Sequence, residues 1–140
     1  MTISQGQCTI FKQKCLSGLE NFNTGTSYVY KIALYTANAD LSYTTTAYTT
    51  TDEITGTGYT AGGATLTPII PASSGQTAYV SFENVTWNPA SFTCRGALIY
   101  NSTTGSAVAV LDFGADKTAT STFTITFPTA DATNAIIRLS

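Results

Sequence analysis

The sequence predicts an all-β protein, an antiparallel β-sandwich of jelly-roll type with one short N-terminal helix. Three stretches alternate between apolar and polar residues, at 28–35, 76–83 and 119–127, and such alternation is typical of strands with one buried face. Threonine, at 28 of the 140 residues, favours strands whose solvent faces carry hydroxyl groups instead of charges. A chain of this length is expected to form one domain, 1–140, with its own core.

Residues 1–22 predict a helical arm. Ser4 and Gln7 have the spacing of a capping box, in which each side chain reaches the other residue's backbone amide. Gly18 is the expected stop. Apolar residues then recur with the spacing of one helical stripe, at Cys8, Phe11, Cys15, Leu19 and Phe22. Packing of this stripe on the β-domain and docking on a neighbouring subunit would give the same pattern.

The three cysteines are predicted to be unbridged. Cys8 and Cys15 are seven residues apart in the expected helix, which separates their Cα atoms by roughly 10 Å. A disulfide needs less than about 7 Å. Cys94 belongs to a different element. Free, mostly buried thiols are consistent with folding in a reducing cytoplasm.

Residues 28–140 predict the β-sandwich, interrupted by a loop-rich segment at 36–63. This segment carries runs of threonine and four glycines with few apolar anchors, so we expect long loops around short strands at 53–55 and 59–61. Loops of such length often carry function. Further strands are expected at 64–70, 76–83, 85–87, 121–127 and 135–139.

The centre of the predicted sandwich is a hairpin over 92–113. Both arms are apolar on both faces near the polar turn at 101–105, so the hairpin needs cover on both sides. A turn symmetric about 102–105 would place Arg95 opposite Asp112 as a cross-strand ion pair, and would pair Leu98 with Ala109. A bulge at Gly105 would move Asp112 out of this register.

Composition and charge argue against several classes of function. A net charge of −2 with 10% charged residues provides no basic patch for nucleic acid. No apolar run approaches the length of a membrane span, and the N-terminus has no secretory pattern. The sequence contains no histidine, which removes the usual triads and His-bearing metal sites. We therefore expect neither an enzyme nor a resident cofactor.

Two weaker site hypotheses remain open. A surface calcium site could use Asp112, Asp116 or Asp131, although the spacing of a calcium loop is missing. Trp87 and several tyrosines could line a sugar-binding groove, although core packing is the favoured explanation for most of them.

Several segments together resemble a family of small virion proteins of tailed bacteriophages. They are YKIALYT at 30–36, TAYTTTDEITGTGYTAGG at 46–63, RGALIYN at 95–101, AVAVLDFG at 107–114, FPTAD at 127–131 and NAIIR at 134–138. The resemblance covers about residues 28–140. It implies a head or tail structural role and no catalytic residues.

Small jelly-roll proteins that cement or decorate capsids are similar in length, β content and low charge. The resemblance therefore implies a cement or decoration protein on the capsid surface, assembled in the host cytoplasm. Its partners would be the major capsid protein and itself, as a dimer or trimer. The alternative is a tail or fibre component that binds host glycan. The expected interaction surface comprises Phe11, Tyr43, Tyr48, Asp52, Glu53 and Tyr59.

Overall fold

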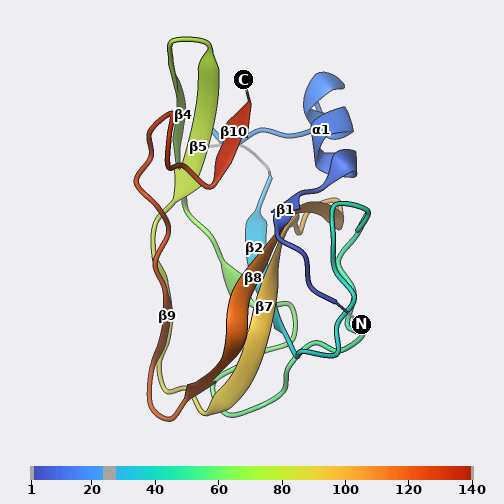
Figure 1. Cartoon of the computed structure of the whole chain (residues 1–140), viewed down its shortest axis with the longest axis vertical. Coiled ribbons are helices and arrows are strands. Elements are labelled where there is room, and N and C mark those ends of the chain that lie inside the picture. The colour runs from blue at the N-terminus through green and yellow to red at the C-terminus, as the bar shows by residue number, and fades with distance from the viewer. Residues whose placement is uncertain (1, 24–27, 140) are drawn as a thin grey trace.

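The computed structural model describes residues 2–23 and 28–139 of the chain. Strands with isolated bridges make up 46% of the described residues and helix 6%, and the strand ladders are antiparallel. The prediction of a mostly β protein with one short N-terminal helix is therefore confirmed. Figure 1 shows an elongated molecule in which the long hairpin of β7 and β8 runs through the centre.

The largest sheet has five strands in the order β1-β8-β7-β2-β3. Its centre is the predicted hairpin, β7 (Phe92–Asn101) and β8 (Ser106–Ala119), and β2 (Tyr30–Tyr35) pairs with the free side of β7. Two-residue strands close the edges, β1 (Gly6–Gln7) on β8 and β3 (Ala64–Thr65) on β2. Residues 97–101 of β7 and 106–111 of β8 are buried on both faces, as the apolar pattern predicts.

The other strands form two smaller sheets. One contains β10 (Ile137–Leu139), β5 (Thr77–Phe82) and β4 (Pro68–Ser74) in that order, and the other pairs β6 (Val85–Trp87) with β9 (Phe123–Ile125). The β4–β5 hairpin projects beyond the body of the protein at one end of the long axis (Figure 1). All of β4 after Pro68 is exposed.

Aromatic side chains connect the sheets across the core. Phe22 stacks on Tyr30 of β2 at a centroid distance of 4.4 Å and meets Phe82 of β5 edge-on at 5.9 Å. Phe92 of β7 meets Phe123 of β9 at 5.5 Å. These contacts place apolar faces of all three sheets against one core.

The predicted register of the central hairpin is confirmed at the turn, where Asn101 lies opposite Ser106, but it is wrong further along the strands, although the predicted ion pair is present. Val108 has no partner across the strands, so Leu98 lies opposite Val110 instead of Ala109, and Gly96 instead of Arg95 lies opposite Asp112. The extra residue lies in the strand and not at Gly105. Residues 113–116 then face Arg95 alone as a second, wider bulge. This irregular backbone still lets the Arg95 Nε donate to Asp112 Oδ1 at 3.1 Å.

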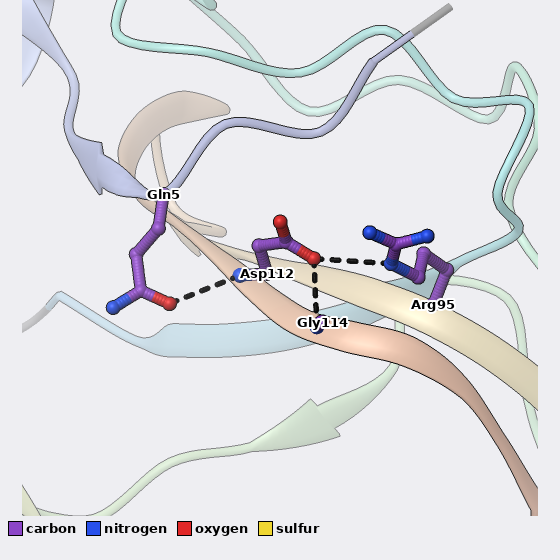
Figure 2. A network of polar contacts seen from close by, with 4 residues as sticks. All are labelled: Gln5, Arg95, Asp112 and Gly114. Carbon is purple, nitrogen blue, oxygen red and sulfur yellow. Dashed lines mark hydrogen bonds and ion pairs between the residues drawn. The ribbon is translucent and has the colours of Figure 1, made fainter.

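Asp112 also fixes the N-terminal arm (Figure 2). Its backbone amide donates to Gln5 Oε1 at 3.1 Å, and the Gly114 amide donates to Asp112 Oδ1 at 2.9 Å. The Gly114 amide and Arg95 hold the pKa of the Asp112 carboxyl below its usual range. A polar cluster at the wider bulge thus ties the arm to β8.

The single helix is shorter than predicted and begins later. Helix α1 spans Thr9–Leu16, with Cys8 at its N-cap and no side-chain cap. The expected capping box at Ser4 is wrong because the backbone there is extended, and the Ser4 amide donates to the Leu41 carbonyl at 2.8 Å. Gly18 ends the helix as predicted. With φ at 73°, it allows the Leu19 amide to reach the Lys14 carbonyl at 2.9 Å.

The helical stripe is confirmed only in part. Phe11 and Phe22 are buried, but Leu19, after the end of the helix, is exposed. Cys8, Cys15 and Cys94 are unbridged, as predicted. Burial raises the pKa of Cys8 and of Cys15 to about 11 and that of Cys94 to about 12, so these thiols are protonated at neutral pH.

Residues 36–63 are loop-rich, as predicted, but the short strands expected at 53–55 and 59–61 are absent from this described segment. It contains only isolated bridges, such as Tyr35 with Glu53 and Ala47 with Ser106. In residues 2–23 and 28–139, no helix is long and apolar enough to cross a bilayer.

Candidate functional site

The six residues predicted to form an interaction surface do not lie in one exposed patch. Tyr43 is exposed, at 63%, and Asp52 is exposed with a φ of 62°. Phe11 is buried in the core at 1% exposure, where its ring meets Phe22 edge-on. Tyr48, Glu53 and Tyr59 are half-buried and face one another.

Glu53 is the centre of a group that we call the tyrosine clasp, formed by Tyr48, Glu53 and Tyr59. The Tyr48 hydroxyl donates to Glu53 Oε1 at 2.6 Å, and the Tyr59 hydroxyl donates to Glu53 Oε2. The Gly62 amide also donates to Oε2, at 2.8 Å. One carboxylate therefore joins three points of the loop-rich segment with charge-assisted hydrogen bonds.

Further contacts anchor the clasp to the large sheet. The Leu34 amide of β2 donates to the Tyr59 hydroxyl at 3.0 Å. Tyr100 of β7 stacks on Tyr48 at 4.6 Å and donates its hydroxyl to the Gly62 carbonyl at 2.6 Å. Desolvation by burial, and then Glu53, raise the pKa of Tyr48 and Tyr59 above the usual range. The tyrosines therefore stay protonated as donors, and the clasp holds a long loop in place.

Other candidate groups of the sequence are also engaged within the protein. Trp87 is buried at 6% exposure and packs against Phe123 at 5.9 Å, so it does not offer an open platform to a sugar. Asp131 accepts hydrogen bonds from the Thr133 and Asn134 amides at 2.9 and 2.6 Å. Among the described residues, no group of three or more acidic or cysteine side chains is placed to hold a metal ion.

An apolar groove lies at the end of the molecule where the β4–β5 hairpin projects. It has a volume of about 130 Å³ and runs between α1, the β4–β5 hairpin and β10. Its walls include Phe11, Cys15, Pro71, Val80, Ile137 and Leu139. Elements from both ends of the chain and from its middle thus form one concave apolar surface.

The elements that border this groove carry most of the large exposed apolar side chains. Leu16 is 92% exposed at the end of α1, and Ile70 is 60% exposed on β4. Leu19, Ile69 and Leu139 are also exposed. Of the seven large exposed apolar side chains among the described residues, these five lie on elements that border the groove, and only Val29 and Tyr43 lie elsewhere. We call this region, α1 with residues 17–20, the β4–β5 hairpin and β10, the apolar end.

Sequence patterns did not reveal the apolar end, although signals for it exist. Leu16 is outside the apolar stripe of the helix, and Ile69 and Ile70 are consecutive, so one of them must face away from a half-buried sheet. No charged residue occurs between Glu53 and Glu83. That uncharged stretch contains the whole projecting hairpin.

Glu20 lines the groove, and residues of the core bond to its carboxylate. Its Oε2 accepts from the Tyr30 hydroxyl at 2.7 Å and from Asn101 Nδ2 at 3.4 Å, while its Oε1 is buried without a partner among the described residues. Burial raises the pKa of this carboxyl.

Comparisons of the chain with protein-family models, curated proteins and solved structures find no match.

Proposed function

We propose that the protein is a structural component of a bacteriophage virion, a capsid cement or decoration protein that docks through its apolar end. The observation that carries the docking role is one apolar groove bordered by α1, the β4–β5 hairpin and β10, the elements that carry the exposed Leu16, Ile70 and Leu139. Exposed apolar surface of this kind on a small protein is typical of an interaction site. The resemblance of residues 28–140 to small phage virion proteins supports the virion setting.

We also propose that the β-sheets form a sandwich of jelly-roll type. The strand pairs are nested along the chain, with β7 against β8, β6 against β9 and β5 against β10. Such nesting describes one long antiparallel ribbon folded over itself, which is the connectivity on which jelly rolls are built. β2 and β3 then extend the central sheet, and the β4–β5 hairpin extends outward.

The mechanism of such a protein is binding without chemistry. A subunit that binds only the assembled shell stabilises it by mass action, because dissociation of the shell must also release the bound subunits. A cement subunit that bridges two neighbouring capsid proteins would bind both at once, so its contacts with each of them would contribute to its affinity for the shell. Low overall charge assists this role, since it keeps like-charge repulsion small when many copies lie close together.

The direct test is to locate the chain in virions by electron cryomicroscopy and then to measure its binding to shells that lack it. The double variant Leu16→Ser/Ile70→Ser should lower affinity for shells at least tenfold, because each buried aliphatic side chain is worth about 1.5–3 kcal/mol. Its free energy of unfolding should change by less than about 0.5 kcal/mol, since both side chains are exposed.

Val29→Ser is the matched control, because Val29 is an exposed aliphatic residue away from the groove. Affinity of this variant for shells should stay within twofold of the unchanged protein. Density for the chain on the tail, together with glycan binding by the free protein, would replace the cement role by the fibre role. Absence of the chain from purified virions would refute both.

A further inference from the structure

Two cationic side chains face a second hollow beside the apolar groove. Lys12 of α1 and Arg138 of β10 line it together with Gln7 and Leu139. Leu139 lines both this hollow and the apolar groove, so the two are neighbours. The pair, which we call the cationic hollow, brings together two of the six basic residues of the chain.

Among the described residues, neither cation has a carboxylate within the 4 Å of an ion pair, and only Arg95 with Asp112 forms such a pair. Arg138 donates one guanidinium hydrogen bond to the Thr133 carbonyl. Hydrogen bonds from Asn134 and Thr133, and then the charge of Arg138, lower the pKa of the Asp131 carboxyl. Asp131 therefore offsets part of the Arg138 charge, and Lys12 with Arg138 together still leave the cationic hollow positive.

A hydrogen bond joins two of the residues that line the hollow. The Gln7 side-chain amide donates to the Arg138 carbonyl at 3.0 Å, which links β1 to β10. The Gln7 Oε1 atom is buried and has no partner among the described residues. Gln7 thus connects β10, which carries Arg138, to the short strand that precedes α1, which carries Lys12.

The groove itself selects against negative charge. Glu20 lines it, and Tyr30 and Asn101 hold this side chain in place, so a carboxylate inserted in the groove would meet both an apolar wall and a like charge. An uncharged apolar side chain has no such cost. At about 130 Å³ the groove is close to the cavity size, about 150 Å³, that holds one benzene.

We propose that the apolar end binds a short segment of a partner protein in which an apolar side chain adjoins a carboxylate. The apolar side chain fills the groove, and the carboxylate, from Asp, Glu or a chain terminus, pairs with Lys12 and Arg138. The inference rests on the proposed docking role and names the chemistry of the docked segment. Complementary charge at the hollow sets the direction in which that segment lies.

A pair of probes tests this chemistry on the full chain. Anilinonaphthalene sulfonate has an aromatic body beside an anionic group, and N-phenyl-1-naphthylamine has nearly the same body without the anion. Fluorescence titration should show that both bind. Lys12→Gln/Arg138→Gln should weaken binding of the sulfonate at least fivefold and that of the neutral amine less than twofold. Lys31→Gln/Lys117→Gln removes the same net charge elsewhere and should weaken neither.

Filling the groove should give the complementary result. Ala78 lines the groove and is exposed, so Ala78→Leu places extra bulk in it without disturbing the core. This variant should weaken both probes at least fivefold. An equal loss of sulfonate binding in both charge variants, or no loss in Ala78→Leu, would overturn the inference.

Selection of random peptides on the immobilised chain then identifies the segment. Enriched peptides should place Leu, Ile or Phe within two residues of Asp, Glu or the C-terminus, and should lose binding to Lys12→Gln/Arg138→Gln. Enrichment of basic peptides would overturn the inference. If Lys12→Gln/Arg138→Gln occupies shells as fully as the unchanged protein, this inference alone is refuted. If the probes bind as expected but the chain is absent from virions, the proposed function alone is refuted.

Discussion

The loop-rich segment at 36–63 and the apolar end differ in where their side chains point, and the difference is the reverse of what their secondary structure suggests. The segment has no strand of its own among its described residues, yet its polar side chains turn inward and hold it to β2 and β7 through the tyrosine clasp. The apolar end is built of a helix and regular strands, yet Leu16 and Ile70 turn outward. Regular secondary structure therefore does not identify the part of this protein whose side chains are engaged within it.

The difference follows from where each region satisfies its polar groups. A loop without ladder bonds needs other partners for its backbone, and Glu53 and Tyr100 supply two of them at Gly62. In the β4–β5 hairpin the two strands bond to each other, so it is ordered without side chains that hold its backbone, and those side chains can face outward. A few specific side chains thus hold the loop in place, and the contribution of each can be tested by substitution.

The largest effect is expected at Gly63, where the loop-rich segment meets β2. A Cβ at Gly63 would lie 2.8 Å from the Ala33 Cα and would overlap the Ile32 carbonyl, and φ is 82°. Gly63→Ala should lower the free energy of unfolding by more than about 3 kcal/mol, because the backbones must separate. Gly75→Ala at the tip of the β4–β5 hairpin is the control. Its φ is 61° but nothing lies within 4 Å, so only about 1–2 kcal/mol of left-handed strain is expected.

Urea unfolding of the two glycine variants measures this contrast. A loss for Gly63→Ala no greater than that for Gly75→Ala would show that the segment does not pack closely against β2.

The tyrosine clasp should give the next effect. Glu53→Gln leaves at most one oxygen to accept three donors and removes the charge that strengthens those bonds. We expect a loss of about 2–3 kcal/mol in the free energy of unfolding. Asp52→Asn is the neighbouring control, since Asp52 is exposed and asparagine tolerates its positive φ, and its effect should stay within about 0.5 kcal/mol. Similar values for the two variants would argue that the clasp contributes nothing.

Alkaline pH should open the clasp. Tyr59 has a raised pKa in the folded protein, from burial and then from its bond to Glu53, whereas its unfolded pKa is near 10. The folded state therefore keeps a proton that the unfolded state loses, so stability is intact below about pH 10 and falls as pH rises above it, by about 1.4 kcal/mol per pH unit. The other tyrosines with raised pKa values, and the thiols from about pH 8.5, lower stability in the same direction. Unfolding of Tyr59→Phe from pH 8 to 11.5, compared with the unchanged protein, isolates the part due to Tyr59, and an unchanged slope would contradict this origin.

The smallest effect is expected for the ion pair in Figure 2. The Arg95 and Asp112 side chains are 33% and 27% exposed, so solvent screens their attraction. A double-mutant cycle with Arg95→Met and Asp112→Asn should give a coupling free energy of about 0.2–1 kcal/mol. A coupling of zero would indicate that the wider bulge is held by the Gly114 amide and Gln5 without help from Arg95.

Periodicity predicted the strands and the central hairpin because those elements follow from local burial. The bulges at Val108 and at residues 113–116 were not predicted, because the position of a bulge depends on packing against neighbouring elements, and no local sequence pattern contains that information. Ser4 escaped for a similar reason, since its backbone pairs with Leu41, far away along the chain. Competition from tertiary contacts overrides a local capping signal of about 1 kcal/mol.

The candidate site was predictable only in its residue types. Tyr48, Glu53 and Tyr59 were predicted to belong to an interaction surface, whereas in the structure they bond to one another, because a carboxylate among tyrosines has the same sequence whether it faces outward or binds those tyrosines. The groove could not be predicted because its walls come from α1, the β4–β5 hairpin and β10, whose meeting depends on the complete fold.

Amide hydrogen exchange, on the free protein and on the protein bound to shells, tests the central contrast most directly. In the free protein, the amides of Ile54 and Gly62 should exchange as slowly as those of β2, because they donate to the Leu34 carbonyl and to Glu53. On binding, new protection should appear in α1, the β4–β5 hairpin and β10. Unprotected amides at 54 and 62 in the free protein, or new protection confined to 36–63 on binding, would contradict the account.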